Sequence, residues 1–468
     1  MSLGRRALVA RAATVGVAAV LWFTPPPDGL ALQAWRLFAI FAAALIAVVI
    51  DAFPILTASV FAVAASVLTG LLQPAQAYSG FGNATILLIV VAFLIADAVV
   101  KCGLGARGGH WIVSRFGRST LGLSYSIFLL DAVIAPAFPS NTARSGVLYP
   151  LAYALADAAG AAPGRSGRQR LGAFLMFSGI ASLSVSSALW LTAMAANPLG
   201  TEMARAVGVE IGFGRWFLAA SVPTFCAMAV LPLVLYRVIS PEVRSTPEAP
   251  AAARQALAAL GPLSRQEWIV LVVFVGMVAL WAAAASLGLD STAIAFLGLG
   301  ALLASNVITL DDIAKQGDVL ATYIWFAVLF TLSGQLDALG FMGYLGGRLA
   351  GICGGFTPLL AGVILIVAYV LLHYLFVSQT AHLLALFGVF LDVGRQLGVP
   401  LAPLAFQLLF ATNFFSANTP QGSSANLLFA GSGYLSQGDL YRLGALTTAF
   451  NLGVYLIVGT PWLVLVSR

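Results

Sequence analysis

Charged residues are scarce in this chain. Only 9% of its 468 residues are Asp, Glu, Lys or Arg, and 60% are hydrophobic, whereas a soluble domain usually carries about 25% charged residues. The mean hydropathy is +0.98. No water-soluble core could bury that much apolar surface, so the composition excludes a soluble enzyme. We assign the net charge of +6 to loops and a few functional sites, and nucleic-acid binding is not expected.

Cysteine and histidine are also rare. The three cysteines stand singly with no CxxC pair, and the three histidines are too far apart in sequence to indicate a metal site by spacing. These residues are Cys102, Cys226, Cys353, His110, His373 and His382. The sequence therefore predicts no cofactor, and it gives no sign of a disulfide or a metal.

Long apolar segments are abundant instead. Segments near the ~20 residues that span a bilayer recur from end to end. They are 31–50, 54–72, 85–100, 119–139, 171–191, 215–238, 267–288, 291–309, 318–338, 357–375 and 441–466. The sequence predicts an all-α polytopic membrane protein without a soluble catalytic domain, and we expect it in the cytoplasmic (inner) membrane of a bacterium.

The first apolar segment, 7–23, has two interpretations. It follows Arg5 and Arg6, as the apolar part of a signal peptide would, but Arg11 interrupts it and no small-residue cleavage site precedes Pro25. We therefore expect a retained first helix. By the positive-inside rule the arginines at its start place the N-terminus in the cytoplasm.

The chain repeats itself on either side of a polar segment, 239–266, which we interpret as a cytoplasmic loop between halves. Four landmarks recur in the same order. They are Ala84-Thr85 and Ala321-Thr322, Leu104-Gly105 and Leu339-Gly340, Ser140-Asn141-Thr142 and Ser378-Gln379-Thr380, and, more loosely, 192–198 and 419–426. Two related halves with broken apolar segments indicate a secondary transporter whose substrate site forms where the repeats meet. We expect an inverted repeat.

The first break is Pro139-Ser140-Asn141-Thr142-Ala143-Arg144, between two apolar runs. Pro139 disfavours a continuous helix, and so many polar groups would be costly facing lipid. A hairpin of two half-helices with this motif at its tip avoids the cost, because non-helical backbone is tolerated where it lines an enclosed cavity. The outgoing half-helix would present free N–H groups to an anion. The alternative is a Ser/Thr/Asn patch that packs helices together.

Arg144 has two interpretations as well. A permanent charge at membrane depth normally has a partner or a ligand. It could bind the substrate directly, or it could pair with Asp131 or Asp97, or extend to the membrane interface. We predict a substrate contact.

The second break is Ser378-Gln379-Thr380-Ala381-His382, joined by 418–424. These segments supply hydrogen-bond donors and acceptors but no acidic residue, so the pocket should prefer anions. Alone, His382 is weak evidence, since a single histidine on an apolar face is usually packed and hydrogen-bonded.

These motifs resemble signatures of a known family. The segments DAVIAPAFPSNTAR (131–144) and HYLFVSQTAH (373–382) look like the two signatures of the divalent-anion/sodium symporter superfamily, in its citrate/succinate and oxoglutarate/malate antiporter branch. The segments SALWLTAMAANP (187–198), NTP (418–420) and GSGY (431–434) resemble further landmarks of that branch. The similarity runs from about residue 80 to the C-terminus.

The resemblance implies a homodimer whose protomers each have a scaffold domain and a transport domain that moves as an elevator. It implies substrate contacts at Ser140, Asn141, Thr142, Ser378, Thr380, Thr419 and Pro420, to which we add Arg144, Gln379 and His382. We also place Ser187, Thr192, Asn197, Asn418, Gln421 and Ser423 around the pocket. Gln379 stands where sodium-coupled members have Asn, and this departure together with Arg144 puts a sodium cage in doubt. Amphipathic arm helices are expected at 107–118 and 341–354.

We therefore predict five segments. They are N-terminal scaffold helices (1–100), the transport elements of repeat 1 (101–238), the loop (239–266), scaffold helices of repeat 2 (267–340) and its transport elements (341–468). The predicted function is exchange of small di- or tricarboxylates. Sodium-coupled symport is the alternative. An intramembrane enzyme using His373 or His382, or an anion channel, is a remoter one, since the sequence has no HExxH motif and no nucleophile elbow.

Overall fold

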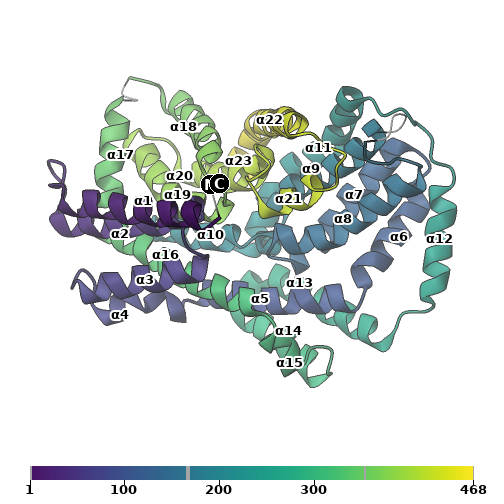
Figure 1. Ribbon diagram of the computed structural model, residues 1–468, viewed down its shortest axis with the longest axis horizontal. Coiled ribbons are helices and arrows are strands. Elements are labelled where there is room, and N and C mark those ends of the chain that lie inside the picture. The colour runs from purple at the N-terminus through teal and green to yellow at the C-terminus, as the bar shows by residue number, and fades with distance from the viewer. Residues whose placement is uncertain (1–2, 165–168, 353–354, 467–468) are drawn as a thin grey trace.

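The computed structural model describes residues 3–164, 169–352 and 355–466, and in these residues the regular structure is helical apart from one isolated β-bridge, Ser119 to Ser245 (Figure 1). Within the described part, nine helices are long and apolar enough to cross a membrane. The predicted all-α polytopic architecture is confirmed. Cys353 and the end of the predicted arm 341–354 lie outside the described residues.

The same series of elements occurs twice. In the first copy it is α5 (Ala84–Lys101), α6 (Leu104–Phe116), α7 (Thr120–Ile134), η2 (Ala135–Ala137), α8 (Asn141–Ala158), α9 (Gln169–Leu189), η3 (Leu191–Ala193), α10 (Ala196–Ala206) and α11 (Phe213–Ile239). In the second copy it is α16 (Gly317–Ala338), α17 (Phe341–Ile352), α18 (Pro358–Leu372), η4 (His373–Leu375), α19 (Gln379–Gln396), α20 (Leu401–Phe414), η5 (Phe415–Ala417), α21 (Ser424–Ala430), α22 (Gln437–Val454), η6 (Tyr455–Gly459) and α23 (Thr460–Val466).

The other helices precede each copy or join the two. They are α1 (Leu3–Phe23), α2 (Leu32–Val49), α3 (Ile55–Leu68), α4 (Pro74–Ala77), η1 (Ser79–Gly82), α12 (Ala249–Leu260), α13 (Arg265–Leu287), α14 (Ser291–Ala304) and α15 (Leu310–Ala314). In Figure 1, α3, α4, α5 and α13–α16 lie along one side, while the hairpins α7–α8 and α18–α19 lie with α9, α11 and α20–α23 on the other.

Each hairpin returns to the side on which it starts. For α7–α8, the segment after α11 contacts both ends of the unit: Thr120 N, at the start of α7, donates to Arg244 O (3.1 Å), and Leu171 N, just beyond the hairpin, donates to Glu242 Oε2 (3.0 Å). For α18–α19, a Cβ on Gly362 would lie 3.2 Å from Val399 Cγ1, beyond the end of α19. Both hairpins are therefore re-entrant.

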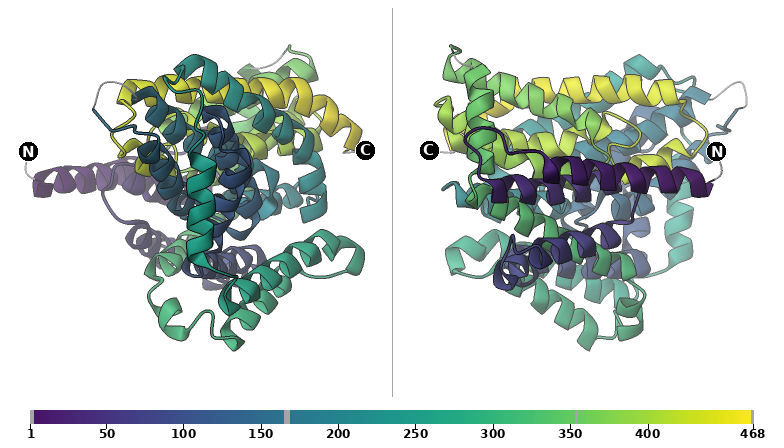
Figure 2. Two further views of the ribbon diagram at one scale, coloured as in Figure 1. Left: turned by 90° about the vertical axis from the view of Figure 1, so that its right-hand side faces the viewer. Right: turned by 60° about the vertical axis from the view of Figure 1, so that its left-hand side comes forward.

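The two hairpins enter from opposite sides. Between them lie four candidate spans, α9 (continued by α10), α11, α13 and α16, and the shorter apolar helix α14. Counting α14 as a crossing gives five, an odd number. The predicted inverted repeat is therefore the arrangement seen. The views of Figure 2 show the same helices turned about the vertical axis.

The segment 239–266 is not simply a loop. It contains α12, which runs along the outer edge of the molecule beside α6 (Figures 1 and 2). Arg107 of α6 joins this region to α13: its Nη1 donates to Gly261 O (2.8 Å), and its Nε pairs with Glu267 at 2.5 Å. The polar composition of 239–266 hid a helix whose alanine-rich sequence favours helix formation.

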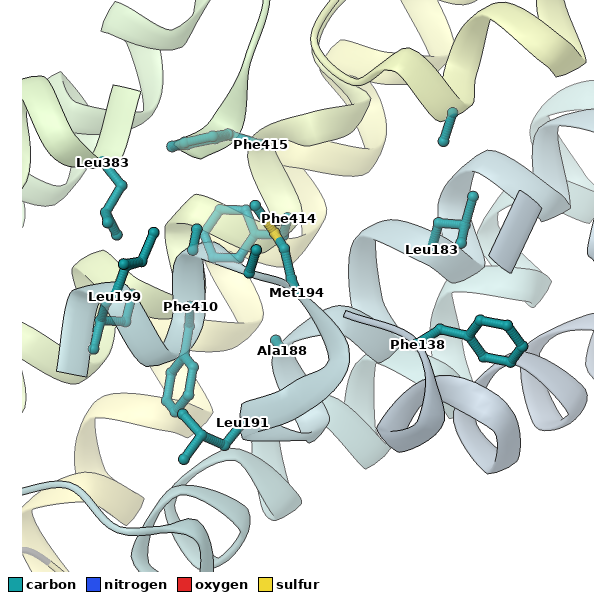
Figure 3. Close-up of a cluster of buried hydrophobic side chains, with 14 of the residues drawn as sticks. Phe138, Leu183, Ala188, Leu191, Met194, Leu199, Leu383, Phe410, Phe414 and Phe415 are labelled. Atoms are coloured by element: carbon teal, nitrogen blue, oxygen red, sulfur yellow. The ribbon is translucent and has the colours of Figure 1, made fainter. Parts of the chain in front are cut away.

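The apolar core packs between the repeats behind the two hairpin tips. Figure 3 shows Leu199 of α10 near Leu383 of α19, with Phe410 and Phe414 of α20 and Phe415 of η5 close by. All five side chains are fully buried. This contact between elements of the two repeats fixes the tips relative to each other.

Gly444 of α22 gives a test of this packing. A Cβ at this position would lie 2.0 Å from Ala417 O, a backbone atom that has no room to move aside. We therefore expect Gly444→Val to lower the free energy of unfolding by about 1–3 kcal/mol through overpacking. Differential scanning fluorimetry in detergent should show this as a lower melting temperature. Gly453→Val on the same helix, where a Cβ meets nothing within 4 Å, is the control. Equal melting temperatures for the two variants would contradict this packing.

Candidate functional site

The two hairpin tips are built in the same way. Ser140 and Ser378 have extended backbone and cap the helices that follow. Ser140 Oγ accepts from Ala143 N, and Ser378 Oγ accepts from Ala381 N, both at 3.3 Å. Serine is a favoured N-cap because its hydroxyl satisfies one of the free N–H groups of the first turn. Each polar break in the sequence is therefore the N-terminus of a half-helix, as predicted.

The tips meet inside the protein. Asn141 Nδ2 donates to Gln379 Oε1 (3.2 Å), and Thr142 Oγ1 lies 2.7 Å from Ser424 Oγ of the second repeat. Both tips line one cavity of about 540 Å³. From the hairpins and broken helices it is lined by Pro139, Ser140, Asn141, Thr142, Ala143, Met194, Ala195, Val377, Ser378, Gln379, Thr380, Ser423 and Ser424.

Backbone donors face this cavity from both sides. The first turn of α8 leaves the N–H groups of Asn141 and Thr142 without a partner among the described residues, and the first turn of α19 does the same at Gln379 and Thr380. A helix N-terminus carries a partial positive charge of roughly half an elementary charge. Two such termini around one cavity make a site for an anion with two negative groups.

The Asn141 and Gln379 amides are fixed by their other partners. Gln379 Nε2 donates to Thr412 O (2.7 Å) and Asn413 O (3.3 Å), so its oxygen faces Asn141. Asn141 Oδ1 accepts from Arg144 and from Ser187 Oγ (2.7 Å), so its NH₂ group faces Gln379. One N–H of Asn141 then remains for a ligand in the cavity.

Arg144 lies behind the tip and not in the cavity. Its guanidinium is fully buried, pairs with Asp131 (Nη1 to Oδ1, 2.8 Å) and donates to Ser186 Oγ (2.7 Å). Arg144, predicted as a substrate contact, does not line the cavity in this conformation, because Asp131 of α7 holds its guanidinium in an ion pair. The ion pair with Asp131 was the alternative interpretation. Arg144 acts on the cavity through Asn141, whose oxygen it holds.

His382 also lies outside the cavity lining, contrary to prediction. It is fully buried, and its ring packs edge-on against Tyr369 at 4.3 Å between centroids, with His373 and Phe415 at 5.3 and 4.7 Å. His373 Nε2 lies 3.1 Å from Gly422 O. Gln379 and Thr380 line the cavity, whereas His382 packs among these rings.

The segment 418–423 is only partly at the cavity. Ser423 lines it, but Asn418, Thr419, Pro420 and Gln421 do not. Asn418 and Thr419 are buried, and Asn426 Nδ2 donates to Thr419 O at 3.0 Å. Thr419 and Pro420, predicted as substrate contacts, therefore do not line the cavity in this conformation, because this turn packs against α21.

Ser187, Thr192 and Asn197 support the first tip from behind. Thr192 Oγ1 donates to Pro136 O (2.9 Å), and Asn197 accepts from Asn413 Nδ2 of the second repeat (2.8 Å). All three are buried. None of the three lines the cavity itself.

Sequence reasoning missed the wall opposite the tips. It is formed by Ile55, Phe93, Gln316, Asp318, Val319, Thr322, Trp325 and Phe326, mostly from the start of α16. Asp318 is exposed there, so the predicted absence of acidic residues holds for the tips but not for the whole cavity. The only sequence signal was Thr322, which marked the repeat. Among the described residues, no group of three His, Cys, Asp or Glu side chains is placed to hold a metal ion.

Comparison with known proteins identifies the family. Residues 5–467 match the family described as "Sodium:sulfate symporter transmembrane region". "Dicarboxylate transporter 2, chloroplastic" of Spinacia oleracea is 37% identical over 456 residues, which cover 96% of this chain and 81% of that protein. The "Citrate/succinate antiporter" of Escherichia coli (strain K12) is 29% identical over 482 residues, covering 98% of this chain and 99% of that protein.

A solved structure shares the fold. The Alcanivorax borkumensis YdaH transporter superposes with a TM-score of 0.59 at 14% identity, covering 98% of this chain and 97% of that one. At this identity the likeness concerns architecture alone. With the family match over nearly the whole sequence, these findings show that the chain is a multi-pass membrane transporter, not an enzyme, and that it belongs to the sodium:sulfate symporter family.

Proposed function

We propose that this protein exchanges small dicarboxylates across the membrane, and that each hairpin tip binds one carboxylate group. The observation that carries the proposal is the pair of half-helix N-termini, at Asn141–Thr142 and Gln379–Thr380, which face one cavity. A carboxylate bound at each tip would accept from two backbone N–H groups. Relatives named as dicarboxylate transporters and as a citrate/succinate antiporter support this substrate class.

Exchange follows from the cost of moving an empty site. A buried donor without a partner costs roughly 1–3 kcal/mol, and the four free N–H groups are hydrated only while the cavity is open. Closing the empty site would leave them unsatisfied, whereas a bound dicarboxylate satisfies them. The loaded site should therefore cross much faster than the empty one.

Exchange also removes the electrical cost of transport. Moving one charge through 100 mV takes about 2.3 kcal/mol, and the Asp131–Arg144 pair adds no net charge to the site. One dianion moving in each direction carries no net charge, so the cycle needs no co-transported cation. Within this ion pair the Arg144 guanidinium donates to Asn141, which lines the cavity, and Asp131 lies on the other side of the guanidinium.

We further propose that the cavity opens to the cytoplasm. The start of α16 lines it, and by the order of crossings that end of α16 shares a side with the N-terminus and the arginine-rich segment after α11. The positive-inside rule assigns this side to the cytoplasm. The expected elevator movement would carry α8, α10 and α19 past α16, within the homodimer that the family resemblance implies.

Proteoliposomes test the proposal. Uptake of labelled malate, succinate, oxoglutarate, citrate or tartrate should require an internal dicarboxylate, with preloaded vesicles at least about tenfold faster than empty ones, a barrier difference of about 1.4 kcal/mol. Exchange of one dicarboxylate dianion for another should not change when Na⁺ is replaced by K⁺ or when a potential is applied. Na⁺-driven uptake into empty vesicles would establish the alternative, sodium-coupled symport. Current without saturation would indicate a channel.

A further inference from the structure

A large apolar groove lies on the outer side of the first hairpin, away from the substrate cavity. Its volume is about 810 Å³, and it is bounded by α6, by the hairpin helix α7 and by α13. Trp111 of α6, Val133 of α7 and Phe274 of α13 line it, and Arg107 is its one charged lining residue. The groove reaches Ala137 in η2, two residues before the tip. On α7 it is lined by the second half of the helix, from Leu129 to Ile134, so it extends toward mid-membrane depth.

Arg107 does not make this groove polar. Its guanidinium is already bound to Glu267 and to the carbonyl groups of Leu260, Gly261 and Pro262. The rest of the lining is apolar, and Trp111 and Val133 are each more than half exposed. A space of this kind within a bilayer suits a hydrocarbon chain.

Three arginines lie near the C-terminal end of α6, beyond Trp111 and Ile112, which are the last groove-lining residues of that helix. The Arg115 guanidinium stacks on the Trp111 ring at 5.6 Å. Arg118 and Arg244 are neighbours, because Thr246 N donates to Arg118 O (3.0 Å) next to the bridge between Ser119 and Ser245. All three are exposed, and none has an ion-pair partner in the described part of the chain.

These arginines stand at membrane-surface depth. Arg118 lies two residues before the span that begins at Thr120, and Arg244 lies five residues after the span that ends at Ile239. Trp111 and Phe116 are exposed beside them, as aromatic residues are at membrane interfaces. A cluster of cations at this depth attracts anionic lipid headgroups.

We propose that an anionic phospholipid binds here, with one acyl chain in the groove along α7 and its phosphate at Arg115, Arg118 and Arg244. Charge complementarity favours this occupant over a second copy of the chain. A two-fold symmetric contact through the same face would place the unpaired arginines of each copy near those of the other. A lipid in this position fills the space between the hairpin helix α7 and α13, which belongs to the opposite side of the molecule in Figure 1. Its binding is independent of the proposed substrate.

Native mass spectrometry of the purified full chain tests the site, with equal amounts of phosphatidylglycerol and phosphatidylcholine added. The protein should retain phosphatidylglycerol preferentially. Arg115→Gln with Arg118→Gln should lower that preference on the order of 10–30-fold, since each surface arginine contributes several-fold. Arg348→Gln is the matched control, because Arg348 also stacks on an aromatic ring, Tyr344 at 5.5 Å, on the other arm helix.

A groove-filling variant tests the acyl chain separately. A Cβ on Gly108 would meet only Leu130 Cδ1, at 3.5 Å, so leucine fits the helix and extends into the groove. Gly108→Leu should reduce retention of both lipids and leave their ratio unchanged. Absence of any lipid preference, an equal loss in Arg348→Gln, or unchanged retention in Gly108→Leu would each overturn the proposal. So would a dimer that Gly108→Leu dissociates without loss of lipid. Lipid binding is read without transport, so this result is independent of the exchange assay.

Discussion

Replacing Arg144 with alanine should destabilise the protein and abolish exchange. The change leaves the Asp131 carboxylate fully buried without its partner, and breaking one side of a buried ion pair costs about 3–5 kcal/mol. It also removes the donor that holds Asn141 Oδ1. We expect a marked loss of thermal stability, and exchange should fall by more than about 100-fold, the equivalent of losing one hydrogen bond to a charged group.

A double variant separates stability from transport. Asp131→Leu with Arg144→Met removes both charges and keeps the volume, and such replacements are often neutral for stability. We expect melting near the wild-type temperature with exchange still strongly reduced, because the Asn141 oxygen then keeps only its hydrogen bond from Ser187 Oγ. Wild-type exchange rates in this folded double variant would show that the Asp131–Arg144 ion pair is not needed for transport.

Removing either amide at the tips should have the second largest effect. Asn141→Ala takes away a donor to the substrate, and Gln379→Ala takes away the partner that orients it. Hydrogen bonds to charged groups contribute about 1.5–3 kcal/mol, so we expect each variant to weaken dicarboxylate binding by about 10–150-fold. Binding of labelled substrate in a scintillation proximity assay measures this directly.

The two amide substitutions should also be non-additive. Residues in direct contact usually show a coupling energy of about 0.5–3 kcal/mol, so the double variant should lose less than the product of the single effects. Gln316→Ala is the control, because this amide lines the same cavity from the opposite wall. Strict additivity, or an equal loss in Gln316→Ala, would show that the contact between the tips is not what binds the anion.

The architecture could be predicted because polar residues within a membrane segment are costly, so a polar break in an apolar run indicates where a helix is interrupted. Pro139-Ser140 and Val377-Ser378 interrupt apolar runs, and each serine proved to be the N-cap of a half-helix. The repeat could be recognised in the sequence because equivalent half-helices in the two copies begin at equivalent polar breaks. The same logic placed Thr192 and Asn197 close behind the first tip.

The orientation of individual side chains was harder to predict, because it depends on contacts across the fold. Whether Arg144 faces a ligand or Asp131 is decided by the rotation of α7 against α8, which sequence spacing alone does not fix. The position of His382 depends on the Tyr369 and Phe415 rings, which come from two other elements. Asp318 was missed because nothing in the first turn of α16 indicates that it faces the hairpin tips. The polar composition of 239–266 concealed α12 for a simpler reason, since a surface helix needs few apolar residues.

A structure of the reconstituted protein with bound succinate would examine the two-tip arrangement most directly. We predict one carboxylate against the backbone N–H groups of Asn141 and Thr142 and the other against those of Gln379 and Thr380, with the ligand spanning the gap between the tips. Succinate bound through Arg144 or His382, or bound at one tip with its second carboxylate on the α16 wall, would contradict it.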